Sequence, residues 1–404
     1  MTPPPASRRR GPGAARAAIV AIVSIVSIAT AQAAPACPAP GAWHVSRGGA
    51  LVERPGREVF EAMAAQDIVL LGEQHDDATH HAWQLEVLGA LHALRPDMAL
   101  GFETFPRRVQ PALDRWVAGT LSEAEFLKEA DWDSVWRLPA ELYLPLFRFA
   151  RMHRLPMIAL NVERSFTEAV ARSGWASVPT ERREGVARPA PPGAAYRATL
   201  RTVFESHEKR RAGEATQADP ALDEAKFERF VEAQTLWDRA MAEALAARLA
   251  GPGRPLVVGI LGTGHVQHGH GVPHQLRALG VTRIGTLLPF DVGAHCSPPA
   301  PDIADALFAV PQVPQAAPPP PRLGVSLAQA DQSVRILEVV PGSLAATSGL
   351  EKGDRIARVA GRPAQRVGEV VAAIRAQPPG TVLPLGIERD GRSFEILVRF
   401  PPRE

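Results

Sequence analysis

Four segments of this 404-residue chain share one pattern: a run of aliphatic residues ends in side chains able to bind a metal, move a proton or form hydrogen bonds. The polar residues that follow these runs are Glu73 with His75, Glu103, Asn161 and His265. Aliphatic runs of this length predict strands that are buried on both faces, as in a parallel sheet. Because ligands of α/β sheets bind beyond the carboxyl ends of the strands, we expect these side chains to meet at one edge of a single sheet.

The donor types in this set suit a metal centre. The candidate catalytic residues and metal ligands are Glu73, His75, Glu103 and His265. Their mixed nitrogen and oxygen donors favour a divalent transition metal such as zinc, manganese or iron. Such an ion lowers the pKa of bound water toward ~7, which predicts a hydrolase with a spare carboxylate as general base. One alternative is a metal-free site in which Glu73 orients His75 as the base. The other is structural: the same groups hydrogen-bond one another and hold the loops in place.

The elements that must position these residues are strands alternating with helices. Strands are predicted over 67–71, 97–102, 155–160 and 255–261, and helices over 78–94, 107–117, 122–129 and 222–249. The first strand is expected to stop at Gly72, which leaves Glu73 and His75 in the following loop. This alternation predicts the α/β class, with a mainly parallel sheet flanked by helices.

Further polar residues are expected to support the site. Asp76 or Asp77 is placed to cap the helix over 78–94. On the helix over 222–249, Gln234 and Asp238 are four residues apart, so one helix face could present both; a solvated helix edge is the alternative. The supporting residues predicted in this way are Asp76, His80, Asn161, Arg164, Gln234 and Asp238.

The first 34 residues have the composition of an export signal. Arginines at 8–10 and 16 precede an apolar run over 17–29, and residues 31–33 supply a small-residue cleavage pattern. The run is shorter than the ~20 residues that cross a bilayer, so we expect cleavage and a periplasmic or cell-envelope location. Removal of residues 1–34 takes away four arginines and no acidic residue, so the formal charge falls from +2 to −2. Nothing in this balance argues for nucleic-acid binding.

The chain has two cysteines, Cys37 and Cys296. In an oxidising compartment we expect them to form a disulfide that ties the mature amino terminus to the end of the α/β region. Lipid attachment to Cys37 is an alternative, although residues 34–36 lack the aliphatic residue expected three positions before a lipidated cysteine. Two free thiols are the third interpretation.

A proline-dense stretch over 310–321 divides the chain into two domains. Proline at this density is expected to extend as a polyproline II spacer of ~3.1 Å per residue, outside any sheet or helix. The spacer separates an α/β domain over 45–309 from a small β-rich domain over 322–402. A second proline-rich stretch, 178–193, is expected to be a surface loop, with a flap over the site as the alternative.

The order of the motifs resembles the ChaN-type members of the Tiki/TraB superfamily over roughly residues 45–310. The resemblance rests on two Gly-x-x-His motifs, Gly72 to His75 and Gly262 to His265, and on Glu103 after the second strand. It implies an α/β fold, an exported and often lipid-anchored protein, and haem binding linked to iron uptake. Related branches of the superfamily are described as metal-dependent proteases, and the erythromycin esterases look similar around the first motif.

The haem binding implied by this resemblance requires an apolar slot and an axial ligand such as Tyr, His, Met or Cys. Only Tyr143 and Tyr196 offer a phenolate, and Tyr143 is the predicted haem ligand because it lies among Trp132, Trp136, Phe147 and Phe149. Packing in the core is the other interpretation of these aromatic residues. The histidines over 265–274 are the second candidate ligands. A haem on a separate surface, shared across a homodimer, is an alternative.

The C-terminal domain resembles a PDZ domain. Leu323, Gly324 and Val325 resemble the loop whose backbone N–H groups hold a peptide carboxylate, and residues 366–376 would form the helix beside the groove. Such a groove captures an extended peptide or a protein C-terminus as an added strand. The leading hypothesis is therefore an exported haem-binding protein with a peptide-binding module. The alternatives are a metal-dependent hydrolase, of the Tiki or erythromycin-esterase kind, and a non-catalytic envelope scaffold.

Overall fold

The computed structural model describes residues 1–2, 37–212, 220–251, 253–293, 299–311, 321–331 and 333–402, and gives the backbone alone for 209–212 and 220–223. The predicted export signal, Cys296 and most of the proline-rich spacer lie outside the described residues. Cys37 is disulfide-bonded. It therefore has no free thiol to which a lipid could be attached.

The N-terminal domain is built on an eight-stranded sheet with the strand order β2-β1-β8-β7-β3-β6-β4-β5. The strands are β1 (Trp43–Arg47), β2 (Ala50–Arg54), β3 (Ile68–Glu73), β4 (Met98–Pro106), β5 (Met157–Asn161), β6 (Leu256–Gly262), β7 (Ile284–Val292) and β8 (Ala306–Pro311). Neighbours from β8 to β5 are parallel, and β1 runs antiparallel to β2 and β8. The predicted α/β class with a mainly parallel sheet is confirmed.

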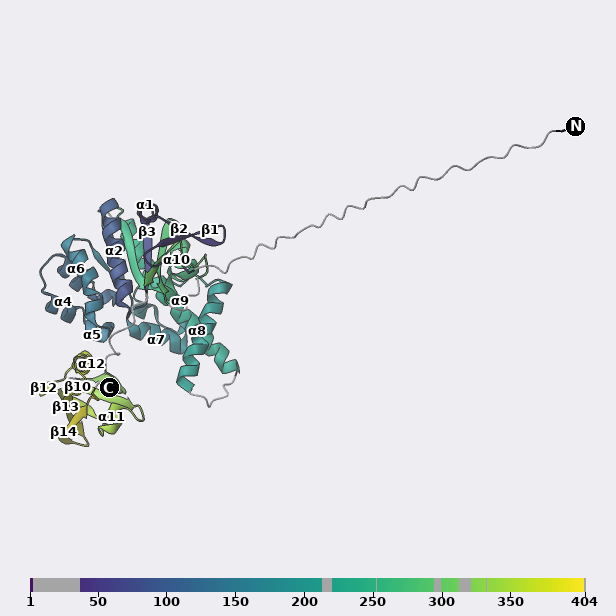
Figure 1. Cartoon of the computed structure of the whole chain (residues 1–404). Coiled ribbons are helices and arrows are strands. Elements are labelled where there is room, and N and C mark those ends of the chain that lie inside the picture. The colour runs from purple at the N-terminus through teal and green to yellow at the C-terminus, as the bar shows by residue number, and fades with distance from the viewer. Residues whose placement is uncertain are drawn as a thin grey trace. The chain divides into compact units, whose positions relative to one another are not determined.

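Helices cover both faces of this sheet (Figure 1). They are α1 (Gly56–Ala64), α2 (Ala78–Leu94), α3 (Gln110–Val117), α4 (Glu123–Glu129), α5 (Trp132–Val135), α6 (Leu144–Met152), α7 (Arg164–Ser173), α8 (Ala194–Ala212), α9 (Pro220–Ala250) and α10 (Val272–Ala278). The α2 helix begins after Asp77, whose carboxylate accepts hydrogen bonds from the N–H groups of Thr79 and His80.

The central strand β3 shows why the aliphatic runs form buried strands. Ile68 and Leu70 belong to the apolar cluster that includes α9 and α10, whereas Val69 and Leu71 belong to the cluster that includes α2. All four side chains are fully buried. Because alternate side chains of a strand point to opposite faces, a strand between two helical layers must be apolar at every position.

Several predicted element boundaries are wrong. The β4 strand does not end at Phe102 but continues through Pro106, so Glu103 lies within this strand and not beyond it. The β3 strand does not stop at Gly72 but continues through Glu73, which is paired with Gly262 of β6. Continuous pairing with the parallel neighbour keeps this carboxylate on the sheet. The β8 strand extends through Val310 and Pro311, the first residues of the predicted spacer. A proline at the last position of a strand is tolerated because few further ladder hydrogen bonds need its missing N–H group.

The C-terminal region forms a second, antiparallel sheet with the order β14-β13-β11-β10-β9, and β12 pairs with β11. Its strands are β9 (Val325–Ala330), β10 (Ser333–Val339), β11 (Arg355–Val359), β12 (Arg362–Pro363), β13 (Val382–Arg389) and β14 (Arg392–Arg399). Two helices, α11 (Leu344–Thr347) and α12 (Val367–Arg375), pack with this sheet around a separate apolar core. The β9 strand is an edge strand, so one side of its backbone is open to a further strand.

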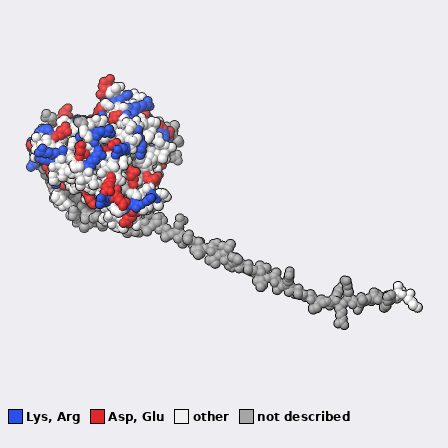
Figure 2. Space-filling model, turned by 90° about the horizontal axis from the view of Figure 1, so that it is seen from above, with Lys and Arg blue, Asp and Glu red and all other residues white. Residues whose placement is uncertain are grey.

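Charged residues of both signs are interspersed over the face seen in Figure 2. This distribution agrees with the near-neutral formal charge of the chain. In the part of the chain that the structure describes, no helix is long and apolar enough to cross a membrane.

The close packing at Gly72 can be tested with a pair of glycine substitutions. A Cβ atom at Gly72 would collide with the buried Leu288 and lie 3.0 Å from the hydroxyl of Thr263. We expect Gly72→Ala to lower the free energy of unfolding by about 1–3 kcal/mol, measured by chemical denaturation. In Gly89→Ala, where α2 leaves open space around the new methyl group, the free energy should instead rise by about 0.5–1 kcal/mol. Equal effects at both positions would contradict this account.

Candidate functional site

The parallel pairing of three strands brings the predicted residues to one edge of the sheet. The β6 strand lies between β3 and β4, so the carboxyl ends of all three strands are neighbours. Glu73 ends β3, Glu103 lies in β4, and His265 follows β6 in a short 3₁₀ helix over Thr263–His265. The Nδ2 group of Asn161, at the end of β5, donates a hydrogen bond of 3.0 Å to the backbone carbonyl of Glu103.

Glu103 lies at the centre of this group. Its Oε2 atom accepts a hydrogen bond of 2.7 Å from the backbone N–H of Gly262. Its Oε1 atom faces two imidazoles, 3.9 Å from Nε2 of His75 and 3.6 Å from Nε2 of His265. These distances are too long for hydrogen bonds but close to the separation of neighbouring ligands around one metal ion.

A second carboxylate holds His75. The Nδ1 atom of His75 lies 2.8 Å from Oε1 of Glu73. The same oxygen accepts a hydrogen bond from the hydroxyl of Tyr143, and Oε2 accepts one of 2.8 Å from the Nε2 group of Gln84. Both oxygens of Glu73 are therefore occupied within the protein. This arrangement gives Glu73 an orienting role rather than the predicted role of metal ligand.

His265 is held in the same manner by a residue of α9. Its Nδ1 atom lies 2.6 Å from Oδ1 of Asp238, and Oδ2 of Asp238 accepts a hydrogen bond of 2.8 Å from the hydroxyl of Tyr196. Asp238 is fully buried. Each imidazole thus contacts a carboxylate that in turn accepts a hydrogen bond from a tyrosine, and both Nε2 atoms face Glu103. The helix α9 presents Asp238 to the site as predicted, whereas the neighbouring Gln234 is half-buried.

Burial and charge act against each other in this site. Burial alone would lower the pKa of His265, but the carboxylates of Glu103 and Asp238 outweigh it and raise the pKa to about 9. Burial likewise opposes protonation of His75, yet Glu73 and Glu103 raise its pKa. For Glu73, burial would raise the pKa, whereas the hydrogen bond from His75 and the nearby His81 imidazole keep the pKa below its ordinary value. The pKa of Tyr143 is raised by burial and by Glu73, so its hydroxyl stays protonated.

His75, Glu103 and His265 offer donor types that could hold a divalent metal ion. Because Glu73 and Asp238 accept hydrogen bonds from the Nδ1 atoms, each imidazole keeps a proton there and can offer its Nε2 lone pair. With Oε1 of Glu103, the protein offers two histidine nitrogens and one carboxylate oxygen, a set used by catalytic zinc and non-haem iron sites. In the metal-free protein His265 is protonated at neutral pH, so a cation must displace that proton.

Other predicted supporting residues are not brought to this centre. Asp76 is exposed beyond the end of β3. Arg164 begins α7 and forms an exposed ion pair of 2.9 Å with Glu168. His80 is buried, but its Nε2 atom faces Oδ1 of Asp291 at 3.2 Å, away from Glu103.

His80 belongs to another group of ligand-type side chains, Asp77, His80 and Asp291, whose donor atoms lie within 4.8 Å of one another. The Nδ1 atom of His80 accepts a hydrogen bond of 2.9 Å from the backbone N–H of Gln74. A neutral ring that accepts at Nδ1 carries its proton at Nε2, where it donates to Asp291 and offers no lone pair to a metal. The hydrogen bonds therefore favour a clamp between α2 and β7 over a metal site.

Tyr143 occupies a different position from the one that haem ligation requires. Its side chain has no exposed surface, and its hydroxyl donates to Glu73. Its ring packs against Trp132 and Phe147, in the way that the core interpretation of the aromatic cluster expected. A haem iron could reach this hydroxyl only after the cluster opened.

The sequence did not reveal several residues that hold the site together. Gln84 and His81 are buried polar residues on α2, and the Nδ1 atom of His81 lies 3.0 Å from the side-chain oxygen of Gln84. Their spacing of three on α2 was the available signal. Tyr196 had no such signal, because it reaches Asp238 across 42 positions of sequence. Trp237, on the helix beside Asp238, donates its indole N–H to the side-chain oxygen of Asn161.

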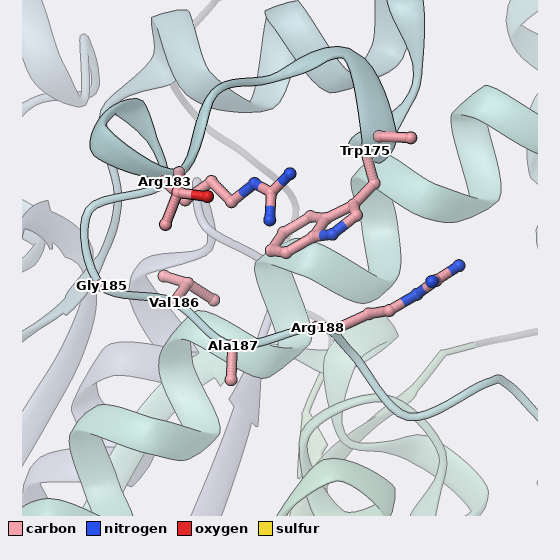
Figure 3. A pocket seen from close by; sticks show the side chains of 8 residues that line it. Trp175, Arg183, Gly185, Val186, Ala187 and Arg188 are labelled. Atoms are coloured by element: carbon pink, nitrogen blue, oxygen red, sulfur yellow. The ribbon is translucent and has the colours of Figure 1, made fainter.

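A separate cavity of about 560 Å³ lies beside the predicted surface loop (Figure 3). Its lining residues are Trp175, Ala176, Thr180, Arg183, Gly185, Val186, Ala187 and Arg188. The guanidinium carbon of Arg183 lies 4.7 Å from the centre of the Trp175 ring. The loop is tethered, since the N–H of Ala187 donates to Glu243 on α9. Guanidinium groups beside an indole suit a carboxylate-bearing ligand, but none of these side chains is of the kind that ligates haem iron.

The fold and the site define an α/β protein with a two-histidine, one-carboxylate centre at the carboxyl edge of a parallel sheet. Residues 59–276, just over half of the chain, match the family model described as haem-binding uptake, Tiki superfamily, ChaN. The chain belongs to this family. Residues 321–399 match the PDZ domain model, so the chain also carries a C-terminal PDZ domain.

Solved structures and one curated protein are similar to parts of the chain. The structure of ChaN of Campylobacter jejuni, which describes cofacial heme binding, matches with a TM-score of 0.51 and 16% identity over 66% of this chain and 96% of that chain. At this identity the match shows the fold alone. A serine endoprotease from Yersinia pestis matches over 21% of this chain and 30% of that one, with 24% identity and a TM-score of 0.19.

The curated protein is a Ralstonia nicotianae protein that bears the name of a zinc metalloprotease. It is 41% identical over 66 residues, which are 16% of this chain. The chain spans only 14% of the length of that relative.

The support that the tyrosines give to the buried carboxylates can be measured directly. Tyr143→Phe keeps the ring but removes the hydrogen bond to Glu73, and Tyr196→Phe does the same for Asp238. Because hydrogen bonds to charged groups contribute about 1.5–3 kcal/mol, we expect each variant to lower the free energy of unfolding by that amount. Ser206→Ala removes an exposed hydroxyl bonded within its own helix and should change it by less than about 0.5 kcal/mol. Tyrosine variants as stable as this control would show that the two hydrogen bonds do not matter.

Proposed function

We propose that this protein is an exported haem-binding protein that serves haem or iron uptake in the cell envelope. The observation that carries the proposal is the match of residues 59–276 to a haem-binding uptake family. The similarity of the fold to ChaN of Campylobacter jejuni, whose structure describes heme binding, supports it. Periplasmic or envelope location follows from the predicted signal over residues 1–34, and a homodimer stays a prediction.

The histidines after β6 fit a haem ligand better than either tyrosine does. Tyr143 and Tyr196 are buried, and both hydroxyls donate to carboxylates. His268 and His270 are partly exposed, with ring centres 5.6 Å apart. The Nδ1 atom of His270 is buried and has no hydrogen-bond partner among the described residues. A buried nitrogen cannot meet an arriving iron, so the partial exposure of the two rings is what favours these histidines over the tyrosines.

A hemin titration of the mature chain tests this proposal. We expect a saturable Soret band that is retained in Tyr143→Phe, because the buried phenol is not available to the iron. The band should weaken or shift in His268→Gln and His270→Gln, because these variants remove partly exposed imidazoles. His274→Gln is the matched control, since the Nε2 group of His274 donates to the carbonyl of Pro191.

Two results would count against the haem proposal in different ways. The absence of any saturable band in the wild-type chain would remove haem binding itself. A band that is lost in Tyr143→Phe but kept in both His268→Gln and His270→Gln would return the ligand to the tyrosine.

The PDZ domain would give this protein a second binding partner, an extended peptide or a protein C-terminus. The β9 strand lies at the edge of its sheet, and Gly324 just before it has a φ of +76°. The carbonyl of Gly324 accepts a hydrogen bond of 2.8 Å from the N–H of Val340, which fixes the turn that leads into the strand. A peptide added beside β9 would pair with its open backbone edge. This arrangement would bring the haem-binding domain to a partner in the envelope.

The geometry at Glu103 favours a second candidate function, a metal-dependent hydrolase. His75, Glu103 and His265 would hold the ion, with Glu73 and Asp238 fixing the two imidazoles. A divalent metal there would supply Lewis acidity for hydrolysis. The protein contributes orientation, because the N–H of Gly262 fixes one oxygen of Glu103 and leaves the other directed at the imidazoles.

Metal content distinguishes this centre from the group around His80. We expect protein prepared without chelator to retain one tightly bound zinc or similar ion through desalting, and His75→Ala to lose it. Asp238→Asn should lower the affinity about 10–100-fold, the usual effect of removing the partner that orients a histidine ligand. Asp291→Asn is the matched control and should leave the affinity unchanged, because the hydrogen bonds of His80 leave its ring no lone pair for a metal ion.

The metal assignment fails if no stoichiometric ion is found in the wild-type protein, or if Asp291→Asn lowers the affinity and Asp238→Asn does not. Peptidase or esterase turnover that follows the metal content across these variants would extend the assignment to catalysis.

A further inference from the structure

Two histidines outside the site described above are in contact at the surface of the α/β domain. His92 lies in the last turn of α2, and His153 directly follows the last residue of α6. Their ring centres are 4.3 Å apart, and the ring planes are inclined by 48°. Both rings also pack against Phe149, at 5.8 and 4.5 Å. Two rigid helices and one buried ring therefore hold the imidazoles together.

The surroundings leave both imidazoles available as ligands. Neither ring has a hydrogen bond or an ion pair to another described residue, in contrast to His75 and His265. Burial and the neighbouring His153 both lower the pKa of His92, which favours the neutral form of the His92 ring. Neutral imidazole is the form that binds transition metals. The neighbouring Met152 is 72% exposed and offers a thioether at the same helix end.

The geometry of the pair is close to that of a chelate. With metal–nitrogen bonds of about 2.1 Å, two imidazoles bound side by side to one ion have ring centres roughly 4.5–5 Å apart. The observed 4.3 Å differs from this by an amount that small side-chain rotations can supply. Both histidines also lie at helix C-termini, where the unpaired carbonyl groups give a partial negative charge that favours a cation.

We propose that His92 and His153 form a surface site for a divalent transition-metal cation of the copper or zinc class. Water or the thioether of Met152 would complete the coordination. Among first-row divalent ions, Cu²⁺ binds most strongly to nitrogen ligands and is the probe of choice. The site is separate from the centre at Glu103 and from the proposed haem ligands, so it does not depend on the proposed function.

Titration of the full chain with Cu²⁺, followed by calorimetry and electron paramagnetic resonance, tests the proposal. We expect the wild-type chain to bind an ion whose spectrum shows coupling to two imidazole nitrogens. His92→Gln and His153→Gln should each remove this spectral component and lower the affinity at least about 100-fold, more than the loss of an outer-shell partner causes. His274→Gln removes an exposed histidine elsewhere and should leave the component unchanged.

Ions bound at His75 and His265 contribute equally to the wild-type and variant spectra. Their contribution cancels when the variant spectrum is subtracted from the wild-type spectrum. Because His153 is exposed and His92 only partly buried, the variants should keep the wild-type melting temperature, which reports on folding. Identical Cu²⁺ binding by the wild-type chain, His92→Gln and His153→Gln would show that the two rings only pack on Phe149, and would overturn the proposal.

Discussion

The site depends on one carboxylate oxygen that has no hydrogen-bond donor among the residues that the structure describes. The N–H of Gly262 occupies Oε2 of Glu103, and Oε1 is left facing the Nε2 atoms of His75 and His265. A buried carboxylate costs several kcal/mol unless charge or hydrogen bonds compensate it. Without a metal, protonated histidines supply that compensation, as the raised pKa of His265 indicates.

The carboxylates behind the histidines explain why so many polar residues lie in a core that is otherwise apolar. Glu73 and Asp238 hold the two imidazoles, and each of these buried carboxylates needs hydrogen-bond donors of its own. Tyr143 and Gln84 donate hydrogen bonds to Glu73, and Tyr196 donates one to Asp238. These donors come from α2, α8 and the segment before α6, so the site ties the helices on both faces of the sheet to the strand ends. This need for hydrogen-bond donors also explains why both tyrosines of the chain are buried against carboxylates.

The residues at the strand ends could be predicted because strand pairing alone determines where they meet. Aliphatic runs define β3, β4, β5 and β6, and parallel pairing then places their last residues at one edge. The roles within the site could not be predicted in the same way. Whether Glu73 binds a metal or holds His75 depends on a side-chain contact between residues two positions apart and on a hydrogen-bond donor 70 positions away in the sequence. The role of His80 likewise depends on the backbone N–H of Gln74, which determines the ring nitrogen that carries the proton.

The two candidate functions of the α/β domain are compatible because they require different surfaces. A haem needs an apolar slot more than 10 Å across in at least one direction, roughly the size of the macrocycle that its axial ligand must reach. Around Glu103, His265 instead packs against Trp237, and Glu73 accepts hydrogen bonds from Tyr143 and Gln84. His268 and His270 follow His265 on the same short connection after β6. The proposed haem ligands and His265 are thus carried by one continuous backbone segment after β6.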